Sequence, residues 1–345
     1  MSNISERKKV FVAMSGGVDS SVAASLLKER GYDVMGAHML CWEGCDSKDD
    51  RQDAMRVAAK LGIGFLTFDF REEYREKVFG YMVSEYAAGR TPNPDVACNK
   101  EIKFGIFLEK ALEMGANYVA TGHYIRKNGD KLFEAKDKNK DQSYFLWAVP
   151  REKLGYCLFP IGDYLKSEVR EMAREVGLPT ADKKDSQGLC FVGKVDFREF
   201  LREILPQKEG AILNSAGEIL GKHDGAHFFT AGQRHGLNLG GFPEPWYVAE
   251  KNTSANTLVV ARGKGDPVLY RKEIEVGDLN LFLDLPEALE VRIRYRQPKQ
   301  KATLSEIKNQ NAKIKFIVPQ RGVAPGQSAV FYSGEEMLGG GIIGA

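Results

Sequence analysis

The sequence predicts an α/β protein with a doubly wound parallel sheet, followed by two β-rich regions. Three observations support this. Short apolar runs alternate with helical stretches in residues 1–130. A glycine- and serine-rich loop follows the first apolar run, as in nucleotide-binding sheets. From residue 209 onward, short β-rich runs alternate with Gly, Pro and Asn turns, which is typical of small antiparallel barrels.

The first elements have a βαβ order. Strands are predicted at residues 10–14, 34–40, 65–68 and 118–121. Helices are predicted between them, at residues 21–30, 50–61 and 100–114, and each is followed by a glycine that can end it: Gly31, Gly62 and Gly115. Ligands of such sheets bind beyond the carboxyl ends of the strands, which places the glycine loop, Met39 and Gly122 around one pocket.

The later elements suggest three domains. Helices are predicted at residues 164–176 and 196–205, and strands at residues 258–261, 290–295, 313–318 and 329–331. We therefore expect a catalytic domain over residues 1–205, with its helical part at 145–205. A small central β-rich domain would occupy residues 206–270, and a C-terminal antiparallel barrel residues 271–345.

Composition limits the class of protein. The chain has 345 residues, which is more than one hydrophobic core usually supports, and a formal net charge of only +2. No run approaches the ~20 apolar residues of a membrane span, and the N-terminus lacks a signal-peptide core, so we expect a cytoplasmic protein without a membrane partner. Five cysteines do not form a secreted disulfide framework, so each is considered for chemistry.

The loop SGGVDSS, residues 15–21, is the strongest functional signal. Gly16 and Gly17 allow backbone amides to turn toward an anion, and Ser20 and Ser21 lie where a helix N-terminus adds further donors. A Walker loop requires a lysine, which is absent here. The loop therefore predicts a site for phosphates of a different ATP-using class. A plain Gly-Ser turn is the alternative.

A cysteine follows a proline-rich loop in TPNPDVACN, residues 91–99. Asn93 and Pro94 suit the start of a helix, which would place Asp95 and Cys98 on one face with the thiol near the first turn. The positive end of a helix favours thiolate, so Cys98 is a candidate nucleophile beside an acid or base. A small buried structural cysteine is the alternative.

The remaining cysteines differ in promise. Cys190, in DSQGLCFV, is of interest because sulfur transfer needs a second thiol to carry or resolve a persulfide. Cys157 is predicted to be a packing residue. Cys41 and Cys45 form a C-x-x-x-C pair, which is a weak metal signal without a second pair. We predict no metal site there, with redox or iron–sulfur ligation as an alternative.

Basic residues gather in two segments. Residues 292–301 hold five basic residues and no acid, and strand alternation would place Arg292, Arg294 and Arg296 on one face, suited to a nucleic-acid backbone. A solvated basic strand edge is the alternative. Lys136, Lys138 and Lys140 could meet the same partner. The histidines lack metal spacing, and only His123 is placed to touch a nucleotide.

Seven motifs in this order closely resemble the tRNA-specific 2-thiouridylases of the MnmA type, within the N-type ATP pyrophosphatase superfamily. They are SGGVDSS, TPNPDVACN, ATGHY, KDQSYFL, SQGLCFV, GQRHGL and RYRQ, and the likeness spans nearly the whole chain. The resemblance implies a pyrophosphatase fold in the catalytic domain. It also implies ATP-dependent conversion of the wobble uridine of tRNA to 2-thiouridine, with Mg²⁺ and persulfide sulfur from a cysteine desulfurase or relay protein.

The resemblance also carries residue roles. Cys98 would be the nucleophile, Cys190 the persulfide carrier and Asp95 the group that handles protons. Further positions are implied in binding. ATP would contact Ala13, Met14, Ser15, Gly16, Gly17, Val18, Asp19, Ser20, Met39 and Gly122. The target base would contact Asn93, Pro94 and Asp95, and the rest of the tRNA would contact Lys140, Asp141, Gln142, Arg294 and Tyr295.

Two departures from the family pattern are SQGL, where STGI is commoner, and the short CWEGC loop, which leaves the role of Cys41 and Cys45 in doubt. The sulfur route stays open between direct persulfide attack, released sulfide and a cluster held by Cys98 and Cys190. The substrates implied are tRNAs of the Glu, Gln and Lys types.

Three other functions remain alternatives. Amidating synthetases use the same ATP loop but need no thiol pair. A non-enzymatic tRNA-binding protein would use the basic segment without the loop. A 4-thiouridine synthase would modify a different carbon of a different uridine.

Overall fold

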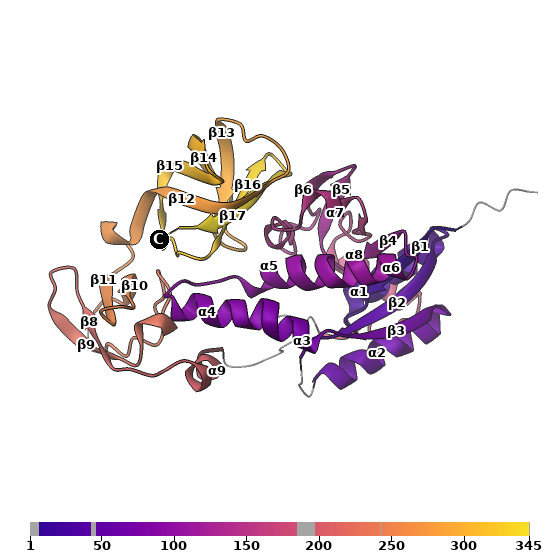
Figure 1. The fold of residues 1–345 in the computed structure, drawn as a ribbon, viewed down its shortest axis with the longest axis horizontal. Coiled ribbons are helices and arrows are strands. Elements are labelled where there is room, and N and C mark those ends of the chain that lie inside the picture. The colour runs from indigo at the N-terminus through magenta and orange to yellow at the C-terminus, as the bar shows by residue number, and fades with distance from the viewer. Residues whose placement is uncertain (1–6, 43–45, 185–196, 242, 345) are drawn as a thin grey trace, which may run out of the picture. The chain divides into compact units, whose positions relative to one another are not determined.

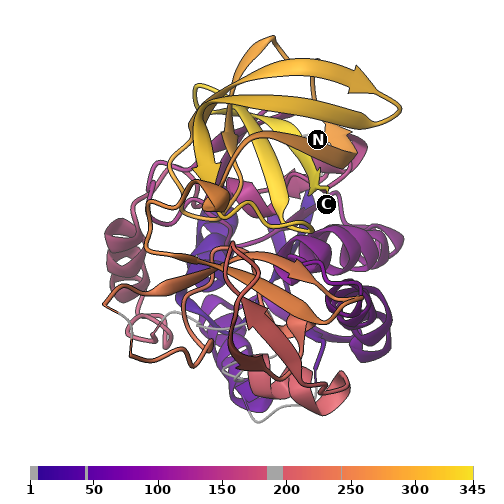
Figure 2. The same ribbon diagram turned by 90° about the vertical axis from the view of Figure 1, so that its left-hand side faces the viewer.

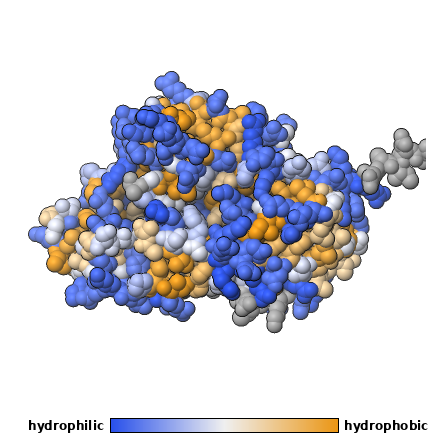
Figure 3. All heavy atoms as spheres, in the orientation of Figure 1, coloured by the Kyte–Doolittle hydropathy of each residue, from blue (hydrophilic) through white to orange (hydrophobic). Residues whose placement is uncertain are grey.

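The structure is a computed structural model that describes residues 7–42, 46–184, 197–241 and 243–344. Its contacts divide the chain into two compact units. The first comprises residues 1–78, 94–195 and 335–337, and the second comprises residues 79–93, 196–334 and 338–345. No helix in the described ranges is long and apolar enough to cross a bilayer. Hydrophilic side chains cover much of the face shown in Figure 3.

The first unit is built on a parallel sheet with the strand order β3-β2-β1-β4-β7. All four pairings are parallel, and the register places Ala13 opposite Ala37 and Val12 opposite Ala120. The strands are β1 (Lys9–Ala13), β2 (Asp33–Leu40), β3 (Gly64–Asp69), β4 (Tyr118–Ala120) and β7 (Cys157–Leu158). Strand order reverses between β1 and β4, so the carboxyl ends of these two strands flank the topological switch point.

Helices cover both faces of this sheet (Figure 1). Val10 and Val12 belong to a core that also contains Val22, Val57 and Val169. Those three lie on the helices of one face, namely α1 (Val18–Glu29), α2 (Asp46–Leu61) and α8 (Lys166–Glu175). On the other face, α6 (Phe107–Glu113) places Phe107 against Phe68 of β3 with ring centroids 5.9 Å apart. Alternate strand residues therefore bury themselves on opposite faces.

A long helical stretch precedes β4. It consists of α3 (Arg71–Tyr74), η1 (Arg75–Gly80) and α4 (Tyr81–Ala87), then α5 (Pro94–Cys98), η2 (Asn99–Ile106) and α6. η1 and η2 are π-helical, and Gly105 in η2 departs from helical geometry at φ −99° and ψ −106°. Short π-helical segments are frequent at functional sites.

Beyond β4 the chain forms a hairpin, β5 (Ile125–Asn128) and β6 (Lys131–Glu134). Glu336 and Met337, which belong to the first unit, pair with β6. η3 (Ser143–Phe145) and α7 (Arg151–Leu154) then lead to β7.

The central part of the second unit is a four-stranded sheet with the order β10-β11-β8-β9. Its strands are β8 (Gly210–Leu213), β9 (Ile219–His223), β10 (Trp246–Asn252) and β11 (Thr257–Arg262), accompanied by α9 (Phe197–Ile204) and the turns η4 (Ala226–Phe228) and η5 (Pro267–Leu269). β8 and β11 pair in parallel, so the expected all-antiparallel arrangement of this region is wrong. The long connection through β9 and β10 is what permits a parallel pair here.

The C-terminal strands close into an antiparallel barrel (Figure 2). Its order is β12-β15-β14-β13-β16-β17, and β17 pairs back with β12. The strands are β12 (Tyr270–Leu281), β13 (Ala288–Arg292), β14 (Gln300–Lys308), β15 (Asn311–Arg321), β16 (Ser328–Ser333) and β17 (Glu336–Ile343). Alternate residues such as Ala312, Ile314 and Phe316 of β15 fill the barrel core.

The predicted fold class is confirmed. Glycines 31, 62 and 115 follow α1, α2 and α6, and their φ angles of 84°, 60° and 79° are those of helix-terminating glycines. The division into domains at residues 205 and 270 stays a prediction. Residues 79–93 belong to the second unit although they lie inside the predicted catalytic domain.

Candidate active site

The loop after β1 lies at the switch point of the sheet. Residues 14–17 join β1 to α1, and residues 121–124 follow the neighbouring strand β4. An ideal Cβ built on Gly122 would lie 2.6 Å from the backbone nitrogen of Ser20. The two segments are therefore in direct contact, which is the position where sheets of this order bind nucleotides.

The loop is held in shape by hydrogen bonds between its own residues. The backbone N–H of Ser15 donates to Oγ of Ser20 over 3.2 Å, and the hydroxyl of Ser21 donates to the carbonyl of Gly17 over 2.7 Å. Gly16 has φ +76°, and a Cβ there would lie 2.2 Å from the carbonyl oxygen of Asp50. Only glycine fits both the conformation and the space at this position.

The start of α1 fits an anionic ligand. Gly17 occupies the N-cap position, and no side chain caps the helix. Gly122 adds to this, because any side chain on it would cover the amide of Ser20. Uncapped amides and the helix dipole together favour phosphate, so the described residues 13–20 and Gly122 are suited to hold a nucleotide's phosphates.

Lys166 supplies the positive charge that the loop itself lacks. Its ammonium lies 2.7 and 2.8 Å from the two carboxylate oxygens of Asp19, and its side chain is only 12% exposed. The hydroxyl of Tyr124 donates to the same carboxylate over 2.8 Å. Sequence reasoning missed Lys166, and it placed Tyr124 near the pocket without assigning it a role. The missing Walker lysine was the signal that a cation had to come from elsewhere in the chain.

The hydrophobic residues assigned to ATP line the same end of the sheet. Ala13, Met14 and Met39 are all buried. The Nδ1–H of His38 donates a hydrogen bond to the carbonyl of Met14 over 2.9 Å, and burial lowers the pKa of the imidazole. The neutral ring therefore fixes the strand that leads into the loop.

Cys98 lies at the end of α5 and is completely buried. The predicted helix start at Pro94 is confirmed, and Asp95 in its first turn is partly exposed. Asn99, the next residue, donates to the carbonyl of Phe145 over 3.2 Å.

The helical stretch that carries Cys98 also contacts the segment after β4. The ring centroids of Phe104 and His123 lie 5.9 Å apart. The His123 ring is buried, and its Nδ1 is hydrogen-bonded to the hydroxyl of Thr121 over 2.7 Å. Burial holds the pKa of the His123 imidazole well below its usual range. The expected contact of His123 with nucleotide stays a prediction. Residues 121–124 touch both the ATP loop and the helix of the candidate nucleophile.

The predicted tRNA contacts at residues 140–142 have structural partners. The buried carboxylate of Asp141 accepts hydrogen bonds from the amide of Ala135 and from the amide and hydroxyl of Ser143. Gln142 bonds the backbone of Tyr124 twice, each over 2.9 Å. These hydrogen bonds hold the segment in shape, and the assignment of Asp141 and Gln142 to tRNA stays a prediction. Lys140 is partly exposed, whereas the neighbouring Lys136 and Lys138 form ion pairs with acids.

The predicted arginine stripe is wrong as a strand feature. β13 ends at Arg292, and Arg296 has φ +64°, so the chain turns where the stripe was expected. The guanidinium of Arg294 donates to the carbonyls of Ala231 and Gly322. That of Arg296 lies over the Tyr295 ring at 5.1 Å. The assignment of Arg294 and Tyr295 to tRNA stays a prediction.

Cys190 and Cys45 lie outside the described residues. The chain enters the segment that contains Cys190 from Lys183, whose ammonium lies 2.7 Å from Asp50 and 2.5 Å from Asp53. Asp50 is also the residue whose carbonyl faces Gly16. Lys183 therefore lies close to the ATP loop.

Two further cysteines lie in the described ranges of the chain. Cys41 and Cys157 are buried, and burial raises the pKa of the Cys157 thiol to about 12, as expected for a packing residue. No cluster of three or more His, Cys, Asp or Glu residues there could hold a metal ion.

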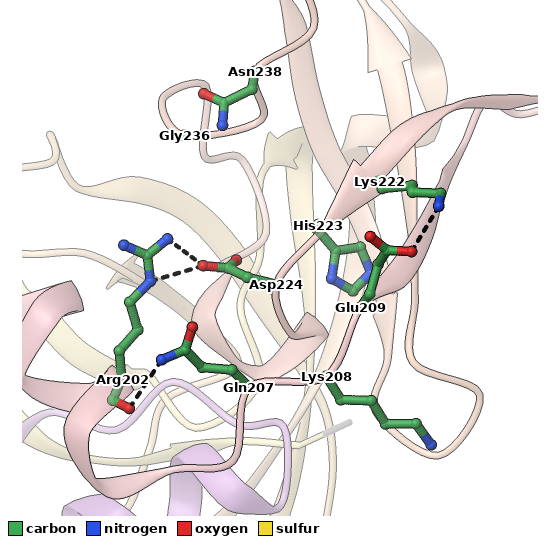
Figure 4. Close-up of a pocket in the computed structure, with 9 residues that line it drawn as sticks. All are labelled: Arg202, Gln207, Lys208, Glu209, Lys222, His223, Asp224, Gly236 and Asn238. Carbon is green, nitrogen blue, oxygen red and sulfur yellow. Dashed lines mark hydrogen bonds and ion pairs between the residues drawn. The ribbon is translucent and has the colours of Figure 1, made fainter.

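A cavity of about 390 Å³ lies in the second unit. Figure 4 shows its polar lining, in which Arg202 pairs with Asp224, and Lys222 pairs with Glu209 over 2.7 Å. None of the residues assigned above to ATP, the target base or tRNA lines it. The cavity is therefore separate from the candidate site.

Three family models match the chain in sequence. A "tRNA methyl transferase HUP domain" matches residues 8–194, a "tRNA methyl transferase PRC-barrel domain" residues 198–262, and an "Aminomethyltransferase beta-barrel domain" residues 271–343. Among solved structures, NMN synthetase from Francisella tularensis aligns with 57% of this chain and 73% of its own, at 20% identity and a TM-score of 0.38.

Curated relatives that match nearly the whole chain have much higher sequence identity to it than this solved structure has. The tRNA-specific 2-thiouridylase MnmA 2 of Geobacillus kaustophilus is 47% identical, covering 99% of this chain and 96% of its own. The tRNA-specific 2-thiouridylase MnmA of Halalkalibacterium halodurans is 48% identical, covering 98% and 95%. That of Legionella pneumophila is 47% identical, covering 98% of each. Identity at this level over nearly the whole length shows common descent, and the chain belongs to the MnmA family of tRNA-specific 2-thiouridylases.

Proposed function

We propose that this protein is an ATP-dependent tRNA sulfurtransferase that converts the wobble uridine of tRNA to 2-thiouridine. The observation that carries the proposal is the segment 121–124. It contacts the lysine-free phosphate loop through Gly122 and the helical stretch of Cys98 through His123. ATP reacts with O2 of the base and sulfur then attacks the adjacent C2, so the ATP loop and the nucleophilic cysteine must be held near the same base.

The first step is activation of the base. The uracil O2 attacks the α-phosphorus of ATP, pyrophosphate leaves, and C2 of the adenylated base becomes electrophilic. The amides at the start of α1 stabilise the leaving phosphates, and Lys166 adds a positive charge beside them. Mg²⁺ accompanying the phosphates would be held by the carboxylate of Asp19, an oxygen ligand of the kind this ion prefers, and would neutralise charge on the leaving pyrophosphate.

The second step is sulfur transfer. In one route, the terminal sulfur of a Cys190 persulfide attacks C2 and AMP leaves. Cys98 then attacks the Cys190 sulfur, which releases the thiolated base and forms a Cys98–Cys190 disulfide. In the other route, Cys98 first displaces sulfide from the persulfide, and the sulfide attacks C2. Both routes end with the same disulfide, so an external thiol must reduce it before the next turnover.

The substrate must present its base away from the anticodon stack, because the reacting atoms cannot be reached inside it. Asn93, Pro94 and Asp95 would receive the base, and Asp95 would move the proton. Lys140, Arg294 and Tyr295 would contact the surrounding RNA. The sulfur comes from a cysteine desulfurase or a relay protein, and we place the reaction in the cytoplasm.

The proposal is tested by measuring AMP formed from ATP with unmodified tRNA of the Glu, Gln or Lys type. The matched control is the same tRNA with cytidine in place of the wobble uridine. We expect AMP formation with the first tRNA and none above background with the second. Equal AMP formation with both tRNAs, or formation that depends on a small carboxylic acid, would favour an amidating synthetase instead.

The iron–sulfur alternative has its own test. A cluster held by Cys98 and Cys190 would give the protein, purified without oxygen, a visible absorption band that is lost in the Cys98→Ser variant. A colourless protein that thiolates tRNA from a desulfurase would support the persulfide route. Thiolation at C4 in place of C2 would indicate a 4-thiouridine synthase.

A further inference from the structure

Residues 89–93 form a short segment, named the strap here, which other residues of the second unit hold by hydrogen bonds. The amide of Thr91 donates to the carbonyl of Pro325 over 2.8 Å. The carboxamide of Gln327 donates to the carbonyls of Thr91 and Pro92, over 2.9 and 3.1 Å. The hydroxyls of Thr91 and Thr230 are 3.1 Å apart. Thr91 and Pro92 are buried by these contacts.

The backbone of the turn before β16 also packs directly on the strap. Gly326 has φ +89°, and a Cβ on it would lie 2.8 Å from the nitrogen and 3.0 Å from the oxygen of Thr91. Gly89, at the start of the strap, packs as closely on Thr253, since a Cβ there would lie 2.6 Å from the Thr253 methyl. Both the central sheet and the barrel therefore set the path of the strap.

The strap leads directly into the residues predicted to receive the target base. Pro92 and Pro94 lie on either side of Asn93. Proline fixes its own φ and restricts the residue before it, so the chain between Thr91 and Asp95 has little freedom to absorb a displacement. A shift at Thr91 is therefore passed on to Asn93.

We propose that Gln327 is a positioning residue for the thiolation reaction, acting on the base-receiving residues through the strap. The inference rests on the proposed function of residues 93–95 and assigns the barrel a second task besides binding RNA. By holding Thr91 and Pro92, Gln327 lets the barrel fix the geometry of Asn93, which belongs to the same unit.

The test is the Gln327→Glu variant. The carboxylate keeps the shape of the side chain but removes two donors and faces two carbonyl oxygens, so the strap should detach locally. Loss of two hydrogen bonds predicts a fall of roughly tenfold or more in the kcat of tRNA-dependent AMP formation. The KM for ATP and the Kd for tRNA should stay unchanged. Asn311→Asp is the matched control, because Asn311 is an amide in the same barrel that bonds only the nearby Asn309 carbonyl.

Hydrogen–deuterium exchange provides a readout that does not depend on activity. Pro92 and Pro94 carry no amide hydrogen, so a peptide over residues 89–94 reports on few amides, including that of Thr91. Exchange of this peptide should accelerate in Gln327→Glu and stay at the wild-type rate in Asn311→Asp. Thr230→Val, which removes only the hydroxyl contact, should change exchange and kcat in the same direction by a smaller factor. It serves as the test if Gln327→Glu does not fold.

Three outcomes would overturn parts of the account separately. Unchanged exchange and unchanged kcat in Gln327→Glu and Thr230→Val would overturn the positioning role. A weakened Kd for tRNA with unchanged kcat would place Gln327 on the RNA surface instead. If the wild-type protein forms no AMP with any tRNA, the proposed function fails, while the exchange data still decide whether Gln327 holds the strap.

Discussion

Substitution of Gly122 by alanine is predicted to weaken ATP binding strongly and to lower the free energy of unfolding by about 1–3 kcal/mol. The added Cβ would lie 2.6 Å from the nitrogen of Ser20, 2.8 Å from the carbonyl carbon of Asp19 and 3.0 Å from its Cβ. The first two are backbone atoms, so α1 or the segment after β4 must move. Overpacking of this kind costs about 1–3 kcal/mol, and covering the Ser20 amide removes a donor to a charged phosphate, worth about 1.5–3 kcal/mol.

The loss of this donor predicts an increase of roughly 10- to 100-fold in the Kd for ATP, measured by isothermal titration calorimetry. Gly155→Ala is the matched control. Gly155 has φ −55°, and the nearest atom to a Cβ there is 3.8 Å away, so the same change should leave ATP binding unaltered. An unchanged Kd in Gly122→Ala, with a normal circular dichroism spectrum, would refute the placement of phosphate over the start of α1.

The remaining predictions concern charge, pH and sulfur. Lys166→Ala should lower the free energy of unfolding by about 1–3 kcal/mol, because it leaves Asp19 without its ion-pair partner, and should raise the KM for ATP; unchanged values of both would contradict the assigned role. Burial depresses the pKa of His123, so the unfolded state takes up a proton near pH 6.5 while the native state does not. Stability should therefore fall as the pH drops below about 6.5, with a slope of up to ~1.4 kcal/mol per pH unit, and His123→Gln should flatten this slope in denaturant titrations. Cys98→Ser and Cys190→Ser should each abolish thiolation and leave the Kd for ATP unchanged; retained thiolation in either would remove that thiol from the mechanism.

The sequence predicted the sheet well because local signals and tertiary packing agree there. The apolar runs of β1 and β2 are buried on both faces, and a glycine ends each covering helix. The prediction of each of these strands and helices therefore rested on a strong local signal. In the first unit β5, β6 and β7 were missed. β5 reads Ile-Arg-Lys-Asn and β7 has two residues, and neither is long or apolar enough to indicate a strand without knowledge of its partner.

Site residues could be predicted from the sequence only where they belong to a contiguous motif. The loop residues and Cys98 come from contiguous motifs, whereas Lys166 reaches Asp19 across 147 positions of sequence. The prediction that Arg292, Arg294 and Arg296 lie on one strand face was wrong because a local pattern was present but the strand ends at Arg292. An alternating pattern predicts one strand face, but the left-handed conformation of Arg296 turns the chain. The assignment of residues 79–93 to the second unit depends on long-range bonds from Pro325 and Gln327 that no local pattern reveals.

The most direct test of the account is nucleoside mass spectrometry of unmodified glutamate or lysine tRNA. The tRNA is incubated with this protein, ATP, Mg²⁺, cysteine and a cysteine desulfurase. The account predicts new 2-thiouridine at the wobble position with the wild-type protein and none with the Cys98→Ser or Cys190→Ser variant. ATP turnover without any thiolated nucleoside would contradict it.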